Sequence, residues 1–297
     1  MGYLLTLGAV FFSAVKGYYG KYVGYHIKSP ADAATASCLR MAFCSVIGLV
    51  LLAVRGELAL LAVDGTSLLI SLLSGLSTAT FIIFWLLSVR SEAFLLLEAF
   101  TTAGVIVPVG LSLLFFEESI TLVQVLGIVV LIITLLIMTS YGKDLKGKLS
   151  VGSFLVLLCA GISCGFCDFS QKLYVREIKE YNIAVFNFYT YLFATAVILL
   201  FLIASSIGKS AFTGQKELLG KVVGKIAVMA VAMFASSYCK TGAATLLPSV
   251  ILYPFYQGIW FLASIVLSAV FFKEKITYKS VIGIILIFAS LLMINFG

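Results

Sequence analysis

Charged residues and histidine are scarce in this chain. Only 11% of its 297 residues are charged, whereas 62% are hydrophobic and the mean hydropathy is +1.16. A soluble domain needs more polar surface than this composition supplies, so the sequence predicts an integral membrane protein. The single histidine, His26, has no second histidine with which to build a metal centre. The sequence also lacks a nucleotide-binding motif and an ATPase domain, so any concentrating work must come from an ion gradient, from exchange or from the substrate's own gradient.

Long apolar runs recur along the whole sequence. A helix needs roughly 20 residues to cross about 30 Å of hydrocarbon, and continuous runs favour helices over the alternating strands of a barrel. We therefore expect an all-α integral membrane fold with ten transmembrane helices. The first run is long and lacks a small-residue cleavage site, so it reads as a retained span and not as a signal peptide. The expected spans are 3–25, 34–54, 67–88, 93–115, 121–139, 151–174, 183–206, 222–245, 248–272 and 278–296.

A duplicated segment divides the chain into two halves. Residues 115–138 and 271–294 lie 156 positions apart and agree at ten positions. Five helices per half is an odd number, so the second half must enter the bilayer in the opposite orientation, which predicts inverted repeats. The expected units are a first five-helix repeat over 1–142, a polar linker over 143–149 and a second, inverted repeat over 150–297. The shared positions are Phe115, Phe116, Glu118, Ile120, Thr121, Val125, Gly127, Ile128, Leu135 and Leu136.

Basic residues are unequally divided between the two expected faces. The face with the loops after the odd-numbered spans has twelve of them and the opposite face has three. The positive-inside bias then places both termini of this multi-pass cell-membrane protein outside the cytoplasm. The net charge of +7 is mostly this asymmetry, so it does not indicate nucleic-acid binding. The twelve are Lys28, Arg90, Lys143, Lys146, Lys148, Lys209, Lys216, Lys221, Lys225, Lys273, Lys275 and Lys279, and the three are Arg55, Arg176 and Lys179.

Short motifs in the two halves resemble the drug/metabolite transporter superfamily, in its EamA-like branch. Each half has Glu-x-Ile-Thr before its last helix, at residues 118–121 and 274–277, and a glycine six residues after the threonine. The resemblance covers essentially the whole chain and implies a ten-helix transporter of a small molecule. The tryptophan and glycine that the family often has in its first helix appear here as Ser13-Ala14, with Cys164-Gly165 in the second half. Arg40 resembles the family's arginine in the second helix, and Lys21 and Lys172 resemble its lysines at the ends of helices 1 and 6.

Few ionisable groups fall inside the expected spans. Such groups are costly in a bilayer and usually face a cavity or a partner, so each is a candidate for function. At about 1.5 Å per helical residue, Lys16, Arg40 and Glu98 reach a similar depth and are expected to form one cluster. Asp168 and Lys240 are expected to form a second cluster nearer the opposite face.

The expected interior contains more cations than acids, together with aromatic surfaces. This suits a small zwitterion or organic anion, such as an amino acid. Arg40 or Lys16 would hold its carboxylate, and Glu98 or Asp168 would face its ammonium group or carry a coupling proton or other ion. We expect no cofactor, no metal and no nucleic acid, and a monomer or homodimer in the lipid bilayer. The expected substrate-binding residues are Lys16, Arg40, Glu98, Asp168, Lys240, Tyr189, Tyr253, Tyr256 and Trp260.

Structural interpretations compete for several of these residues. Arg40 and Glu98 can form an ion pair that fixes helix register. Lys21, Lys172 and Lys240 can extend to the membrane interface. We expect Glu118 and Glu274, in tight loops, to make caps or loop-to-helix contacts. The prolines predict a break in the fourth span at Pro108, and a start or a break of the ninth at Pro248 and Pro254.

Other functions also stay open. An exporter of cationic aromatic drugs would require Glu98 and Asp168 to be unpaired and to dominate an aromatic cavity. A non-transporting receptor is a further alternative. A membrane-embedded enzyme would need a nucleophile and base or a metal centre near one face, and the sequence has no such grouping. Cys164 and Cys167 have CxxC spacing, but in a membrane helix they are expected to act as small apolar side chains.

Overall fold

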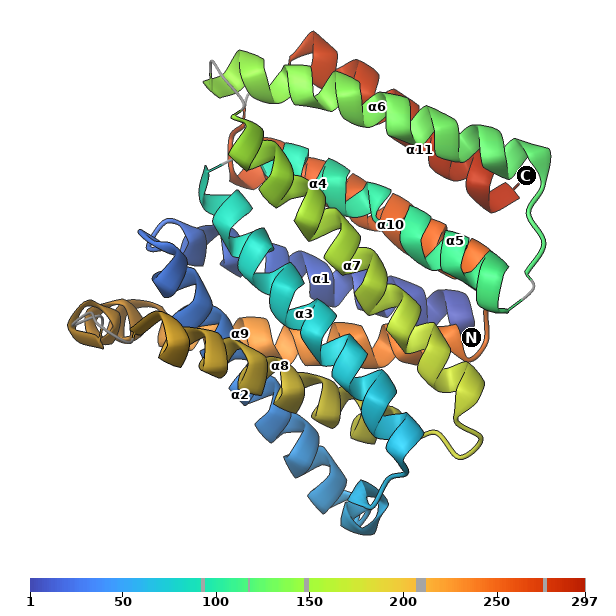
Figure 1. Ribbon diagram of the computed structural model, residues 1–297. Helices are drawn as coiled ribbons and strands as arrows, with labels where there is room; N and C mark the ends of the chain where they lie inside the picture. The colour runs from blue at the N-terminus through green and yellow to red at the C-terminus, as the bar shows by residue number, and fades with distance from the viewer. Residues whose placement is uncertain (92–93, 117, 147–149, 207–211, 275–276, 297) are drawn as a thin grey trace.

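The computed structural model is a bundle of helices (Figure 1). It describes all residues except 92–93, 117, 147–149, 207–211, 275–276 and 297, and that described part contains no strand. The helices are α1 (Gly2–Gly24), α2 (Pro30–Val54), η1 (Leu58–Leu61), α3 (Gly65–Ser91), α4 (Phe94–Ala103), α5 (Ile106–Phe115), α6 (Leu122–Lys146), α7 (Val151–Glu177), α8 (Ile183–Ser206), α9 (Phe212–Ala244), α10 (Ser249–Val266), η2 (Leu267–Phe271) and α11 (Tyr278–Phe296).

The expected all-helical membrane fold is confirmed. Within the described residues, eight helical segments are long and apolar enough to cross a membrane. The other two expected spans are α1, a helix of 23 residues, and α6, a helix of 25 residues. α6 continues through the first part of the expected linker to Lys146, and residues 147–149 lie outside the described part. The eight are Pro30–Val54, Gly65–Val89, Phe94–Phe115, Val151–Glu177, Ile183–Ala204, Gly220–Ala244, Ser249–Phe271 and Tyr278–Asn295.

The duplicated threonines cap the last helix of each half. The Gln124 backbone N–H donates to Thr121 Oγ1 at 3.2 Å, and the Thr121 N–H donates to Gln124 Oε1 at 2.9 Å. Thr277 and Ser280 repeat this reciprocal arrangement ahead of α11, at 3.4 and 2.9 Å. Each pair satisfies backbone donors that the first turn of a helix leaves without partners. The Glu-x-Ile-Thr motifs therefore end in helix caps.

Pro108 interrupts the fourth span, as predicted, so that this span is divided into α4 and α5. Proline has no N–H to donate to the Gly104 carbonyl. That carbonyl accepts a shorter-range hydrogen bond from the Val107 N–H at 3.0 Å, and the helix is broken there. The start predicted at Pro248 is also confirmed, since Pro248 directly precedes α10, whereas Pro254 lies inside that helix.

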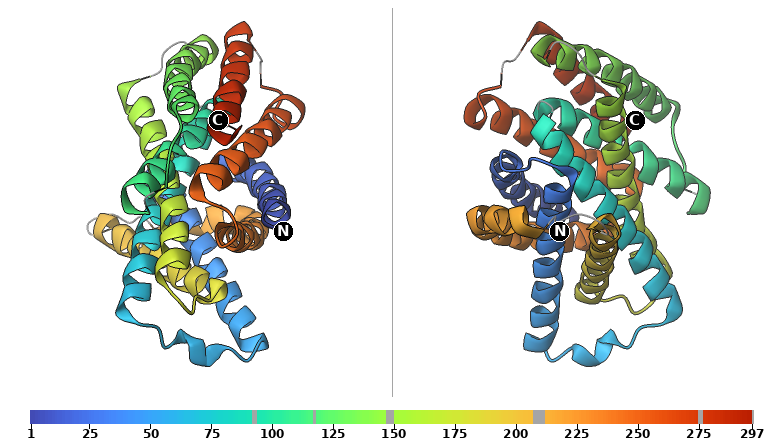
Figure 2. Two further views of the ribbon diagram at one scale, coloured as in Figure 1. Left: turned by 90° about the vertical axis from the view of Figure 1, so that its right-hand side faces the viewer. Right: turned by 60° about the vertical axis from the view of Figure 1, so that its left-hand side comes forward.

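Helices of the first half pack on helices of the second. The most extensive pairs are α1 with α9, α3 with α7, α2 with α8 and α6 with α11. Figure 1 shows α6 and α11 side by side at one edge, and the turned views of Figure 2 keep them there, with α2 and η1 at the opposite edge. Successive helices run alternately toward the left and the right of Figure 1, α4 and α5 run in the same direction, and both termini lie at the right.

Glycines bring α7 against the broken fourth span. A Cβ atom added at Gly161 would lie 2.4 Å from the Phe100 carbonyl oxygen, and one added at Gly104 would lie 2.2 Å from the Gly161 oxygen. A Cβ atom added at Gly165 would lie 2.3 Å from the Gly104 carbonyl oxygen. Only residues without a side chain permit this approach of two backbones, which is a common device in membrane helices. Because residues three and four apart share a helix face, the contact also fixes the face of α7 that carries Asp168.

Candidate functional site

A cavity lies where helices of both halves meet, with walls from α1, α3, α4, α7, α8, α9 and α10. It contains side chains from both of the clusters expected from the sequence, which therefore share one space. Six of the expected binding residues line it. They are Lys16, Glu98, Asp168, Lys240, Tyr256 and Trp260.

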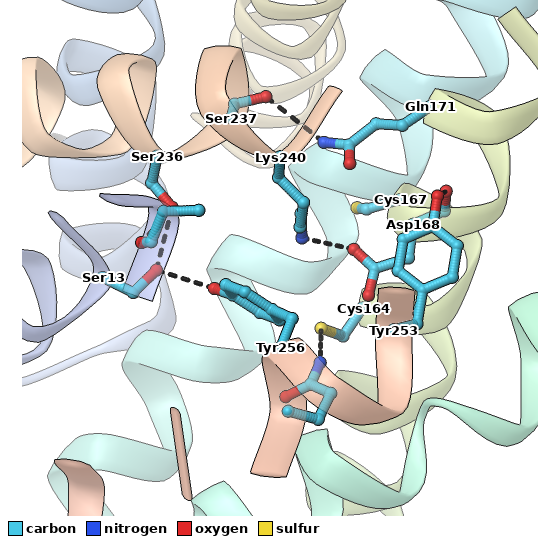
Figure 3. A network of polar contacts seen from close by, with 12 residues as sticks. Ser13, Cys164, Cys167, Asp168, Gln171, Ser236, Ser237, Lys240, Tyr253 and Tyr256 are labelled. Carbon is cyan, nitrogen blue, oxygen red and sulfur yellow. Dashed lines mark hydrogen bonds and ion pairs between the residues drawn. The ribbon is translucent and has the colours of Figure 1, made fainter. Parts of the chain in front are cut away.

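Asp168 and Lys240 form a buried ion pair on one side of the cavity (Figure 3). The Lys240 ammonium group also lies 4.6 Å from the centroid of the Tyr256 ring. Tyr253 stands behind this pair, where its hydroxyl donates to the Asp168 carbonyl at 2.6 Å, and it supports the wall without lining the cavity. The second carboxylate oxygen of Asp168, Oδ2, has no hydrogen-bond partner in the described part of the chain. Lys240 therefore points inward, and the alternative that it extends to the membrane interface is wrong.

Glu98 is held by both tryptophans of the chain. Trp85 Nε1 donates to Oε1 at 3.1 Å, and Trp260 Nε1 donates to Oε2 at 2.6 Å. Thr101 Oγ1 adds a third hydrogen bond, to Oε2, at 3.0 Å. The sequence analysis missed Trp85. The one sequence signal for it is that a tryptophan inside an apolar span needs an acceptor for its indole N–H. Neutral donors therefore occupy both oxygens of this carboxylate.

Two cations inside the bundle, Lys16 and Arg40, form no ion pair in the described part of the chain. The Lys16 ammonium group lines the cavity, interacts electrostatically with Glu98, and forms no hydrogen bond with any residue that the structure describes. Arg40 is 2% exposed and lies behind the cavity wall. Its Nε and Nη2 atoms have no described acceptor, and it forms no described ion pair with Glu98. The register-fixing ion pair considered from the sequence is therefore not formed.

A hydroxyl network connects α1, α9 and α10 beside these charges (Figure 3). The Ser13 hydroxyl lies 2.7 Å from the Tyr256 hydroxyl and 2.9 Å from the Ser236 hydroxyl. Ser236 in turn donates to the Ala9 carbonyl at 2.9 Å. The sequence singled out Ser13 only as a departure from a family motif, and it gave no signal for Ser236. The network holds the Tyr256 ring beneath the Lys240 ammonium group.

A comparison with known families and structures agrees with this fold. Residues 151–296 match the model of the EamA-like transporter family. The second half of the chain belongs to that family. One crystal structure of a protein matches with a TM-score of 0.66, covering 98% of this chain and 95% of its own at 14% identity, which shows the fold alone. No curated protein matches the sequence.

The family match confirms the resemblance seen in the motifs and is consistent with the drug/metabolite transporter superfamily. EamA-like proteins are transporters and not enzymes. With its apolar helices, this chain is a multi-pass membrane protein whose second half matches the EamA-like family.

Tyr189 does not line the cavity. Its hydroxyl donates to the Leu61 carbonyl at 2.6 Å, which directs the ring toward η1, near the end of the bundle. The structure therefore corrects the expectation that Tyr189 lines the site.

Lys21 and Lys172 also differ from what the sequence predicts. Both ammonium groups are hydrogen-bonded to protein atoms, so neither extends away from the protein toward lipid.

The cavity also contains two free thiols, Cys164 and Cys167. The Thr78 hydroxyl lies 3.5 Å from Cys167 Sγ, and Gln257 Nε2 lies 3.9 Å from Cys164 Sγ. Within the described residues, no three histidine, cysteine or acidic side chains gather as a metal site would require. Both thiols line the cavity wall, so a reagent inside the cavity would meet them.

Proposed function

We propose that this protein is a secondary-active transporter of a small zwitterion or organic anion, with an amino acid as the best-fitting class. Ten transmembrane helices would form two inverted repeats, residues 1–142 and 150–297, joined by residues 143–149. The substrate would bind between the repeats near the middle of the membrane and reach each side by alternating access.

The packing pattern supports the inverted repeats. If each helix is exchanged for its counterpart in the other half, the contact of α1 with α9 becomes the contact of α7 with α3. The contact of α1 with α10 becomes that of α7 with α4 and α5, while α2 with α8 and α6 with α11 map onto themselves. All of these contacts occur in the structure. α1 and α7 also run in opposite directions in Figure 1, which is the arrangement that a two-fold axis in the membrane plane produces.

The proposal rests on polar groups in the cavity that have no hydrogen-bond partner in the described part of the chain. The Lys16 ammonium group has no described acceptor, so it can hold a substrate carboxylate by a charge-assisted hydrogen bond. On the α7 and α10 walls, Asp168 Oδ2, Gln171 Oε1 and Gln257 Oε1 have no described donor. A buried polar atom without a partner costs free energy, which a ligand can recover. A cation and a set of open acceptors in one cavity match the two ends of a zwitterion.

The coupling ion would bind at Asp168 or Glu98. Asp168 is the stronger candidate, because Oδ2 is open to a proton or a metal cation while Oδ1 keeps its contact with Lys240. Glu98 already accepts three hydrogen bonds, and protonation would displace at least one of these donors. The pairing of Asp168 also argues against the alternative of a cationic-drug exporter, which requires both acids to be unpaired.

Lys16→Gln is the direct test of this function. We expect purified protein in liposomes to accumulate or exchange labelled amino acids, and the variant to lose most of this transport because the carboxylate loses its cation. A loss of one charge-assisted hydrogen bond corresponds to roughly a tenfold change or more. Lys28→Gln, which removes an exposed lysine in the loop after α1, is the control and should transport normally. Equal transport by both variants, or binding of quaternary amines in place of amino acids, would reject the proposal.

A further inference from the structure

The duplicated glutamates lie at opposite ends of the bundle. Glu274 follows η2, which continues α10, and α10 runs toward the left of Figure 1, where α1 ends and α4 begins. Glu118 follows α5 in the sequence, and α5 ends on the right, where α7 ends and α10 begins. Each glutamate therefore stands next to helix ends of the other half of the chain.

Glu274 fastens its own half to the first half with a full set of hydrogen bonds. Its Oε1 atom accepts from Lys21 Nζ at 3.1 Å and from the Phe94 N–H at 2.8 Å. Its Oε2 atom accepts from the Leu95 N–H at 3.3 Å and from Ser268 Oγ at 2.6 Å. Phe94 and Leu95 open α4, so a carboxylate from the second half caps a helix of the first half. The positive end of that helix and the lysine both favour the charged carboxylate.

Glu118 makes the corresponding contact incompletely. Its Oε1 atom accepts from the Ser249 N–H, at the start of α10, at 3.3 Å. Its Oε2 atom has no described partner. Lys172, the counterpart of Lys21, donates to the carbonyls of Ala244 and Leu247 at 3.1 and 2.8 Å and forms no described ion pair with Glu118.

A pair of matched serines shows the same difference. Ser112 precedes Glu118 by six residues, and Ser268 precedes Glu274 by six residues. Ser268 donates to Glu274, whereas Ser112 is fully buried and its hydroxyl has no described partner. The second end thus has the donor and the acceptor of the missing hydrogen bond, both unused. Buried polar groups left in this state are destabilising, so the arrangement gains free energy if the end closes.

We propose that Glu274 and Glu118 are two latches that fasten the repeats to each other at opposite faces of the membrane, and that transport requires them to close in turn. In this structure the Glu274 latch is closed and the Glu118 latch is partly released. The inference rests on the inverted repeats of the proposed function. Each latch is a positioning device, since neither carboxylate lines the cavity.

The test measures access to the cavity from each face and needs no substrate. Cys164 and Cys167 line the cavity, so their alkylation by a membrane-impermeant maleimide, read by peptide mass spectrometry, reports opening on the side of the reagent. A tag on the C-terminus marks the Glu118 face in right-side-out and inverted vesicles. In the unmodified protein, we expect faster labelling from the Glu118 face.

Glu274→Gln should raise labelling from the Glu274 face several-fold, because the amide lacks the charge that holds Lys21 and the α4 amides. Glu118→Gln is the matched control, and it should not raise labelling from that face. Ser268→Ala keeps the charge and should give a smaller rise on the same face, and it serves if Glu274→Gln does not fold. Unchanged labelling in Glu274→Gln and Ser268→Ala, or a rise on both faces in every variant, would overturn the latch. If labelling is side-specific as expected but the protein does not transport amino acids, only the substrate assignment is rejected.

Discussion

Asp168 and Lys240 neutralise each other's charge in the cavity wall. Asp168 is 1% exposed, and its partner Lys240 is held by the carboxylate and by the face of Tyr256. Burying an ion pair gives little net stability, because desolvation of both ions opposes their attraction. Removing one partner is different, since it leaves an uncompensated charge inside the protein.

Asp168→Asn should therefore destabilise the protein strongly. Loss of one partner of a buried pair typically costs about 3–5 kcal/mol, and thermal unfolding of the purified protein in detergent would show it as a lower midpoint. The double variant Asp168→Leu with Lys240→Met replaces both charges by apolar groups and should recover most of the lost stability. An Asp168→Asn midpoint equal to that of the unmodified protein would contradict the structure of this pair.

The sequence identified the buried ionisable residues but not their partners. Low hydropathy inside an apolar run is a local property, so Lys16, Glu98 and Asp168 were found from composition and depth. Partners such as Lys21 and Glu274 are 253 positions apart, and only the packing of the helices brings them together. The ion pair considered between Arg40 and Glu98 is not formed, because depth in the membrane does not determine which helix faces meet.

Helices as elements were more predictable than the contacts between them. Run length and hydropathy located the eight described helical segments that can cross a membrane, and proline chemistry located the break at Pro108 and the start after Pro248. The approach of α7 to the broken fourth span depends on glycines that carry no hydropathy signal. Their role became visible only from the distance between two backbones.

Gly161→Ala should loosen the contact between α4 and α7. The added Cβ atom would lie 2.4 Å from the Phe100 carbonyl oxygen, so the backbones must separate. Overpacking of this kind costs typically about 1–3 kcal/mol, and it should lower the unfolding midpoint. Gly152→Ala is the control on the same helix, where the nearest atom to an added Cβ is Ser150 Oγ at 3.7 Å. If both substitutions shift the midpoint equally, close backbone contact at Gly161 does not stabilise the bundle.

The molecule as a whole should sit in the membrane with both termini outside the cytoplasm. The basic face contains most of the lysines and arginines, and positive charge favours the cytoplasmic side. In intact cells, we expect an antibody to reach a tag on either terminus. Protease added outside should leave the stretch from Lys143 to Lys148 uncut and should cleave it in inverted vesicles. The reverse pattern would show that the charge bias does not set the orientation of this protein.

The near-equivalence of the two ends has a thermodynamic consequence. Ser112 and Glu118 already possess the groups that Ser268 and Glu274 use, so closing one end while releasing the other exchanges similar bonds. Two conformations related in this way differ little in free energy, so neither is strongly favoured over the other. A carrier of this design would work in both directions with comparable ease, and the prevailing solute concentrations would decide whether the cell gains or loses the compound.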